Sequence, residues 1–231
     1  MPSQKNNKTE DTMRLNQYLA KRGIASRREA DEFIEKGKVL VNGKKAVLGQ
    51  KINPVKDVVD FQGKASYVYY AYNKPKGIVT TTPQKGEKDI LKVTRFPQKV
   101  FPIGRLDKDS HGLIIMTNDR KLTTHMLGPT STYDKEYIVT IQEKVTDHFL
   151  DFLRNGVTLD DGTKTKKCKA SKIAPDKFSI TLLEGKNRQI RRMVDAYKYH
   201  VEDLKRIRIG KVFLRDLKPG LFRSIAPKEL F

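Results

Sequence analysis

Cysteines and paired metal ligands are scarce in this sequence. One cysteine, Cys168, stands among 231 residues, which excludes an internal disulfide and a zinc site built from several cysteines. The four histidines lack the H-x-x-x-H spacing of a helical metal site. A Gly-x-x-x-x-Gly-Lys-Ser/Thr loop is also missing, which gives nucleotide hydrolysis no support. We therefore expect chemistry that needs neither a metal nor a cofactor, and a passive structural role for Cys168.

Long apolar runs are missing as well. No stretch approaches the ~20 residues that a membrane-spanning helix needs. Residues 1–12 are polar, lack the apolar segment of a secretory signal and are expected to form a disordered leader. A protein bound to a membrane surface would need a helix with a broad apolar face and a basic one. We expect a cytoplasmic protein without a membrane partner.

Positive charge is abundant. The chain has 47 Lys+Arg and 27 Asp+Glu, a formal net charge of +20. Such an excess favours a polyanionic partner, because each phosphate that Lys or Arg neutralises releases condensed counterions. Nucleic acid is the simplest partner of this kind.

Residues 13–62 have the pattern of a small separate module. Leu15, Tyr18 and Leu19 recur at helical spacing. Ser26 and Glu29 match a capping box at the start of a second helix. A hairpin should follow, because Asn42-Gly43 suits a type I′ turn. The two helices carry the basic residues Arg14, Lys21, Arg22, Arg27 and Arg28. These form either an ordinary solvated face or a surface that binds nucleic acid.

Residues 67–231, after a short polar linker, alternate between strand and helix patterns. Expected strands cover residues 67–72, 113–116, 137–141, 168–173, 178–183 and 207–214. Expected helices cover residues 120–127, 145–154 and 187–197. This order predicts an α+β domain with flanking helices on a mixed, largely antiparallel sheet.

Charged residues crowd the segment from Pro102 to Leu113, which glycines bracket. Arg105, Asp107 and Lys108 lie within four positions of one another. The segment could be a charged surface turn. A carboxylate near guanidinium groups also stays ionised, however, as a nucleophile or a base requires.

The helix expected over 187–197 has three arginines with different surroundings. Its buried stripe should consist of Ile190, Met193, Val194 and Tyr197. Arg191 borders that stripe and is best placed to enter the protein and meet a buried acid. Arg188 and Arg192 lie opposite the stripe and suit phosphate, as do the backbone donors at the helix start.

Tyr137 opens an apolar strand after Lys135 and Glu136. Most tyrosines in such positions belong to a core or its rim. Beside an active site, the ring could stack on an extruded base.

Together these segments are similar to two known families. The patterns over 13–19, 23–30 and 37–43 resemble an S4 RNA-binding domain. Four further motifs resemble the bacterial ribosomal RNA pseudouridine synthases, closest to the F branch of the large-subunit enzymes. They are Lys74-Pro75-Lys76-Gly77, Gly104-Arg105-Leu106-Asp107 with Ser110-x-Gly112-Leu113, Lys135-Glu136-Tyr137, and Gly185 through Met193. The resemblance covers nearly all of the chain after residue 12.

The resemblance implies a role for each matching residue. Asp107 holds the position of the catalytic aspartate, Tyr137 that of the tyrosine that stacks on the target base, and Arg191 that of the arginine that pairs with the aspartate. Arg105 matches a residue that helps to hold the RNA open. Further RNA contacts are expected from Lys74, Leu106, Lys108, Asn187, Arg188, Gln189, Ile190 and Arg192.

The implied reaction isomerises a uridine to pseudouridine in ribosomal RNA, most simply in a stem-loop or bulge of 23S rRNA, after the base is flipped out. The carboxylate of Asp107 would either attack C1′ or remove a ribose proton. Alternatives are 16S rRNA as the substrate, or an RNA-binding ribosome assembly factor without catalysis. We expect a monomer.

Overall fold

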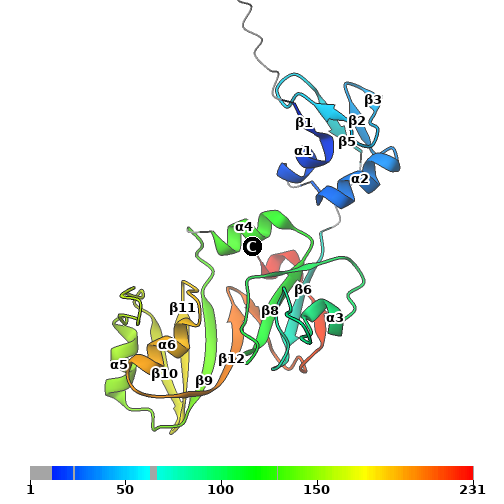
Figure 1. Cartoon of the computed structure of the whole chain (residues 1–231). Helices are drawn as coiled ribbons and strands as arrows, with labels where there is room; N and C mark the ends of the chain where they lie inside the picture. The colour runs from blue at the N-terminus through cyan, green and yellow to red at the C-terminus, as the bar shows by residue number, and fades with distance from the viewer. Residues whose placement is uncertain (1–11, 23, 63–66, 129, 231) are drawn as a thin grey trace, which may run out of the picture. The chain divides into compact units, whose positions relative to one another are not determined.

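The chain divides into two compact units, Met1–Ser66 and Tyr67–Phe231. The structure is a computed structural model, and it describes residues 12–22, 24–62, 67–128 and 130–230 (Figure 1). Three parts of the chain discussed above lie outside these residues. They are residues 1–11 of the expected leader, Gly23, and residues 63–66 of the expected linker. The first unit has one apolar core and the second unit has two, and none is shared, so the units are described separately.

The helices of the first unit follow the expected pattern. They are α1 (Leu15–Lys21) and α2 (Arg27–Glu35). The capping box at the start of α2 is confirmed, because the Ser26 hydroxyl accepts from the Glu29 amide at 3.2 Å while the Glu29 carboxylate accepts from the Ser26 amide at 2.7 Å. One face of the pair is apolar and packs inward through Leu15, Leu19, Ala30 and Ile34.

Short strands complete the first unit. They are β1 (Met13–Arg14), β2 (Val39–Val41), β3 (Lys44–Lys45), β4 (Lys51–Ile52) and β5 (Val59–Phe61). Strand β2 lies between β3 and β5, and β1 pairs with β4. Asn42 and Gly43 have φ values of 50° and 77°, which a type I′ turn requires. The predicted hairpin is therefore confirmed.

A nine-stranded sheet forms the frame of the second unit. Its strands are β6 (Tyr69–Lys74), β7 (Phe101–Ile103), β8 (His111–Thr117), β9 (Lys135–Ile141), β10 (Lys169–Ala174), β11 (Lys177–Leu182), β12 (Val201–Ile209), β13 (Val212–Phe213) and β14 (Phe222–Ser224). Their order is β10-β11-β9-β12-β8-β6-β14, with β13 on β12 and β7 on β8. Only the pairing of β12 with β8 is parallel among these strands, so the predicted mixed, largely antiparallel sheet is confirmed.

One predicted strand is wrong in its bounds. Residues 207–214 are not a single strand, because Gly210, with a φ of 54°, turns the chain between β12 and β13. Strand β12 ends at Ile209, directly before this turn, and it begins at Val201, six residues before the predicted start.

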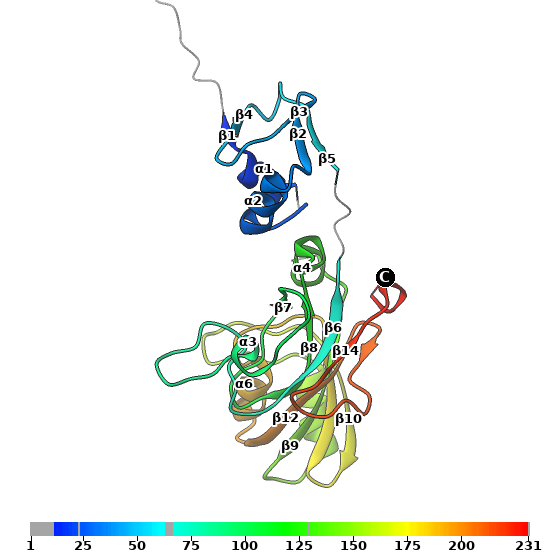
Figure 2. The same ribbon diagram turned by 90° about the vertical axis from the view of Figure 1, so that its right-hand side faces the viewer.

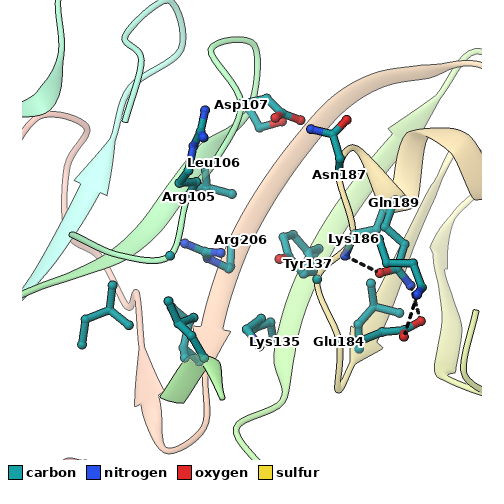
Figure 3. Close-up of a pocket in the computed structure, with 18 of the residues that line it drawn as sticks. Arg105, Leu106, Asp107, Lys135, Tyr137, Glu184, Lys186, Asn187, Gln189 and Arg206 are labelled. Atoms are coloured by element: carbon teal, nitrogen blue, oxygen red, sulfur yellow. Dashed lines mark hydrogen bonds and ion pairs between the residues drawn. The ribbon is translucent and has the colours of Figure 1, made fainter. Parts of the chain in front are cut away.

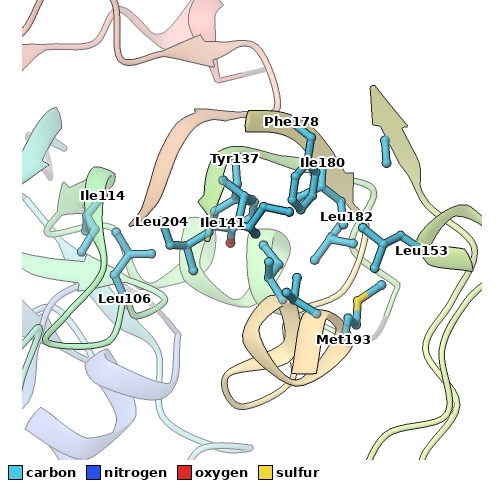
Figure 4. Close-up of a cluster of buried hydrophobic side chains, with 14 of the residues drawn as sticks. Leu106, Ile114, Tyr137, Ile141, Leu153, Phe178, Ile180, Leu182, Met193 and Leu204 are labelled. Carbon is cyan, nitrogen blue, oxygen red and sulfur yellow. The ribbon is translucent and has the colours of Figure 1, made fainter. Parts of the chain in front are cut away.

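Helices cover both faces of this sheet. They are α3 (Ile90–Val93), α4 (Arg120–Leu127), α5 (Asp147–Arg154) and α6 (Gln189–Ala196), followed by the 3-10 turn η1 (Pro227–Glu229). Alternate residues of β8 separate the two cores. Ile114 and Met116 join the core under α5 and α6, whereas Leu113 and Ile115 join the core under α4. Figure 1 shows α5 and α6 beside β9–β11, Figure 2 shows α3 and α6 to the left of β6 and β14, and Figure 4 shows part of the larger core.

Strands β8 and β12 touch over a very short length. Their parallel pairing consists of Lys205 with His111 and Arg206 with Gly112. A Cβ atom on Gly112 would lie 2.2 Å from the Arg206 carbonyl oxygen, and the φ of Gly112 is 105°. The two halves of the sheet can therefore join here only through a glycine.

We predict that Gly112→Ala destabilises the second unit by roughly 3 kcal/mol or more, because the added methyl group collides with backbone that cannot move away. The matched control is Gly86→Ala. Gly86 also has a positive φ, of 86°, but open space around its Cβ position, so it should lose only about 1 kcal/mol. Chemical denaturation of both variants measures the difference, and equal losses would show that the close approach is not the cause.

Candidate active site

A cleft of about 890 Å³ opens in the second unit. This volume lies within the roughly 300–1,000 Å³ typical of ligand sites. One wall is the segment Ile103–Asp107 between β7 and β8, and the opposite wall is the segment Leu182–Ile190 leading into α6. Tyr137 and Arg206, from β9 and β12, contribute to the lining between these walls (Figure 3).

Asp107 lies in the first wall, in the loop that joins β7 to β8. Its side chain is 36% exposed, and the nearest cationic atom is Arg188 Nη1 at 3.7 Å. The Ser110 amide donates to the Asp107 carbonyl at 3.1 Å and closes the loop. Figure 3 shows Asn187 facing Asp107 across the cleft. Since β8 lies between β12 and β6, the loop leads into an internal strand of the sheet.

A buried lysine supports this loop. Lys74, at the end of β6, is fully buried and donates to the Ser110 carbonyl at 2.7 Å and to the Pro75 carbonyl at 3.0 Å. Burial lowers the pKa of Lys74 to about 8, although the charges of Asp109 and Asp107 act in the opposite direction. The ammonium group of Lys74, which the sequence predicted to contact RNA, thus faces carbonyl groups of the loop.

This lowered pKa predicts an unusual dependence on pH. Raising the pH from 7 to 9 should deprotonate Lys74 in the folded protein and weaken its support of the Asp107 loop. The uridine isomerisation that the sequence motifs imply should then become slower. An unfolded lysine holds its proton up to about 10.4. Deprotonation of the folded state therefore contributes added, not lost, stability between about pH 8 and pH 10.

The test compares single-turnover rates with thermal unfolding temperatures over this range. The rate should fall while the contribution of Lys74 to stability does not. Lys74→Met has no titratable group at this position. Its rate should already be low at pH 7, and it should lack the fall in rate that deprotonation of Lys74 causes. A decline of equal size in Lys74→Met would remove Lys74 as its cause.

The arginines of α6 have partners that differ from the predicted ones. Three members of the predicted stripe, Ile190, Met193 and Val194, are buried, and the fourth, Tyr197, is the C-cap of α6 and is partly buried against the same core. Arg191 is only 11% exposed, as expected, but its ion pair is with Asp109 at 3.1 Å and not with Asp107. Arg191 also donates to the Val201 carbonyl at 3.1 Å, which holds the side chain toward β12. Arg188, at the helix N-cap, is the arginine beside Asp107.

Two other residues predicted to contact RNA have partners within the protein. Arg192, which was expected to bind phosphate, pairs with both Asp160 and Asp161. Gln189 is buried, and its amide donates to Glu184 and accepts from the Lys186 backbone at 3.0 Å. Gln189 thus ties the wall of the cleft to α6.

The base of the cleft combines an aromatic ring with apolar side chains. Tyr137 is buried, as are Leu106, Leu204 and Ile190, which also line the cleft. The guanidinium of Arg206 lies 5.9 Å from the centre of the Tyr137 ring. An aromatic ring with apolar side chains around it suits a nucleobase, which can stack on the ring.

Arg206 is the residue that the sequence pattern missed. It is 3% exposed, and its Nε donates to the Leu113 carbonyl at 2.7 Å. The expected strand began at residue 207 and so left Arg206 outside it. Placing it within an apolar strand would have drawn attention to it, because a charged residue at a buried strand position is rare.

The remaining predicted RNA contacts lie on the surface. Arg105, Lys108 and Asn187 are exposed around the cleft, and Lys108 pairs with Glu87 at 2.9 Å. The basic residues of the first unit, Arg14, Lys21, Arg22, Arg27 and Arg28, are all exposed.

Cys168 and the remaining acidic groups do not form a second reactive centre. Burial raises the pKa of the Cys168 thiol to about 11, and Sγ donates to the Leu153 carbonyl at 3.2 Å. Within the described residues, no group of three or more histidine, cysteine or acidic side chains could hold a metal ion. No helix in the same part of the chain is long and apolar enough to cross a membrane.

Family models match both units. Residues 68–196 match the RNA pseudouridylate synthase family, and residues 13–59 match the S4 domain. The chain belongs to the RNA pseudouridylate synthase family, and it is an isomerase that acts on RNA. The family and the S4 domain predicted from the sequence motifs are thereby confirmed.

Individual relatives agree with this assignment. The dual-specificity RNA pseudouridine synthase RluF of Escherichia coli K12 is 44% identical over 96% of this chain and 78% of its own length. The ribosomal large subunit pseudouridine synthase B of Bacillus subtilis is 35% identical over 94% of this chain and 93% of its own. A crystal structure of a pseudouridylate synthase superposes with a TM-score of 0.70 at 26% identity, covering 94% of this chain and 98% of that one.

Proposed function

We propose that this enzyme isomerises a specific uridine of 23S ribosomal RNA, with Asp107 as its catalytic carboxylate. The observation that carries the proposal is the position of Asp107, partly exposed on one wall of the cleft and 3.7 Å from Arg188. The position lets the carboxylate face a substrate bound in the cleft, as a nucleophile or base must do. Tyr137, also in the lining, offers its ring to the extruded base.

The reaction needs no group beyond those of the cleft and its substrate. The bond between N1 of uracil and C1′ breaks, the base turns, and a new bond joins C1′ to C5. The hydrogen on C5 then leaves, and N1 gains a proton. Asp107 either attacks C1′ directly or removes a ribose proton, and both routes require an ionised carboxylate.

The target uridine must leave its helix to reach Asp107. Flipping a base costs a few kcal/mol, and less in a loop or bulge. Phosphate contacts from exposed cations such as Arg105 and Arg188 would offset that cost. Arg191 supports the site indirectly, because its ion pair with Asp109 joins α6 to the loop that carries Asp107.

The choice of 23S rRNA rests on relatives. The Bacillus subtilis relative is named as an enzyme of the large ribosomal subunit. The Escherichia coli relative is named as dual-specific, which favours examining a second RNA. Transcripts of 23S and 16S rRNA labelled with tritium at C5 of uridine test the choice, because the new bond at C5 releases tritium to water. Release from the 16S transcript alone would overturn the 23S assignment.

We predict that Asp107→Asn slows pseudouridine formation by more than about a thousandfold, because an amide can neither attack C1′ nor accept the ribose proton at a useful rate. RNA affinity should stay within a few-fold of the unchanged protein. Tritium release under single-turnover conditions measures the rate, and filter binding measures the affinity.

Asp109→Asn is the matched control. Asp109 lies in the same loop, and its carboxylate is 3.5 Å from Arg188, against 3.7 Å for Asp107. Its loss should cost much less than that of Asp107, since Asp109 only holds arginines. An unchanged rate of pseudouridine formation in Asp107→Asn would contradict the catalytic role of Asp107.

We also predict that removing residues 1–62 weakens binding to structured rRNA by at least about tenfold, through the loss of cations that contact phosphate. The remaining unit should stay folded, because its two cores contain no residue from the first unit. Its rate at saturating RNA should change little. Binding measured over a series of salt concentrations should show a shallower slope, and undiminished affinity would contradict the assigned role of the S4 domain.

A further inference from the structure

A buried threonine outside the recognised motifs is hydrogen-bonded to the backbone next to Asp107. The Thr80 hydroxyl donates to the Leu106 carbonyl at 2.6 Å and accepts from the Leu106 amide at 3.0 Å. Thr80 is 3% exposed, and both hydrogen bonds are buried. One side-chain oxygen therefore satisfies both backbone groups of the residue that immediately precedes the proposed catalytic carboxylate.

The segment that carries Thr80 has no regular structure of its own. It belongs to the chain between β6 and α3, and beyond Thr80 it continues through Thr82, a non-glycine residue with a φ of 56°. The same segment touches the Asp107 loop at two further points. The Gly77 amide donates to the Lys108 carbonyl at 2.8 Å, and Glu87 pairs with Lys108, an exposed contact.

The contacts of Thr80, Gly77 and Glu87 restrain the Asp107 loop to different degrees. An exposed ion pair such as Glu87–Lys108 contributes little and leaves the side chains mobile. The Gly77 bond holds a backbone position beyond Asp107. The two bonds of Thr80 hold the Leu106 amide, in the peptide between residues 105 and 106, and the Leu106 carbonyl, in the peptide that leads to the Asp107 Cα. They therefore restrain both peptide planes next to Leu106, the second of which determines where the Asp107 side chain begins.

We propose that Thr80 is a positioning residue for the isomerisation, which sets the place and direction of the Asp107 carboxylate through the Leu106 backbone. The inference rests on the proposed role of Asp107. Thr80 itself is buried and does not line the cleft. Its effect should appear in the rate of the chemical step and not in RNA affinity, because reacting groups displaced by about 1 Å can lose on the order of a hundredfold in rate.

The chain provides a matched control at Thr117, the last residue of β8. Its hydroxyl also makes two backbone hydrogen bonds, donating to the Val68 carbonyl at 2.7 Å and accepting from the Asp119 amide at 3.0 Å. Thr117 is fully buried and does not line the cleft. Thr117→Val removes the same chemistry as Thr80→Val, but away from Asp107.

The experiment uses the full chain as the unchanged protein, Thr80→Val, Thr80→Ser and Thr117→Val, with a tritium-labelled 23S rRNA transcript as the substrate. Thr80→Val should lower the single-turnover rate at saturating enzyme by roughly ten- to a hundredfold, with RNA affinity within about twofold of the unchanged protein. Thr80→Ser, which keeps the oxygen, should recover most of the rate. Thr117→Val should lose stability but keep its rate.

Amide hydrogen exchange supplies a measurement that does not depend on activity. The Leu106 amide should exchange at least about tenfold faster in Thr80→Val than in the unchanged protein or Thr80→Ser, because its acceptor is gone. A full rate in Thr80→Val, a Thr80→Ser variant as slow as Thr80→Val, or an equal loss of rate in Thr117→Val would each overturn the positioning role. An unchanged protein that releases no tritium from either rRNA, or full activity in Asp107→Asn, would instead overturn the proposed function on which this role rests.

Discussion

The close approach of β8 and β12 at Gly112 determines where the cleft can form. These strands pair through only two residue pairs, and beyond them the chain on either side is free to diverge. Strand β8 begins where the Asp107 loop ends, whereas β12 places Arg206 opposite Tyr137 of β9. The carboxylate and the aromatic ring thus reach one cleft from the two halves of the sheet. A side chain at Gly112 would push these halves apart.

Buried cations around this junction bond to backbone carbonyl groups. Lys74 donates to the Ser110 and Pro75 carbonyls, and Arg206 donates to the Leu113 carbonyl. Burial of a charged group is costly unless hydrogen bonds replace its water. The carboxylate of Asp107, in contrast, is partly exposed on one wall of the cleft, where a substrate can reach it. The interior cations therefore shape the backbone around the site, while the exposed ones face the solvent that RNA would displace.

Periodic patterns predicted the elements best where burial follows sequence spacing. The helix over residues 120–127, the stripe of α6 and the capping box of α2 all agree with the structure. Such features depend on neighbours within one or two turns, which the sequence displays directly. The strand over 207–214 failed because Gly210 turns the chain inside an apolar run, and apolar composition alone does not reveal a turn.

The sequence by itself determined the family, the S4 module, the mixed sheet and the candidate residues Asp107, Tyr137 and Arg191, since motifs and periodicity are properties of neighbouring positions. Only the tertiary structure decided which charges meet. It paired Arg191 with Asp109 and placed Arg188 beside Asp107. It also buried Lys74 beneath the loop. Ion pairs between α6 and the β7–β8 loop join residues about eighty positions apart, and their partners depend on side-chain reach across the cleft, which a helical wheel does not contain.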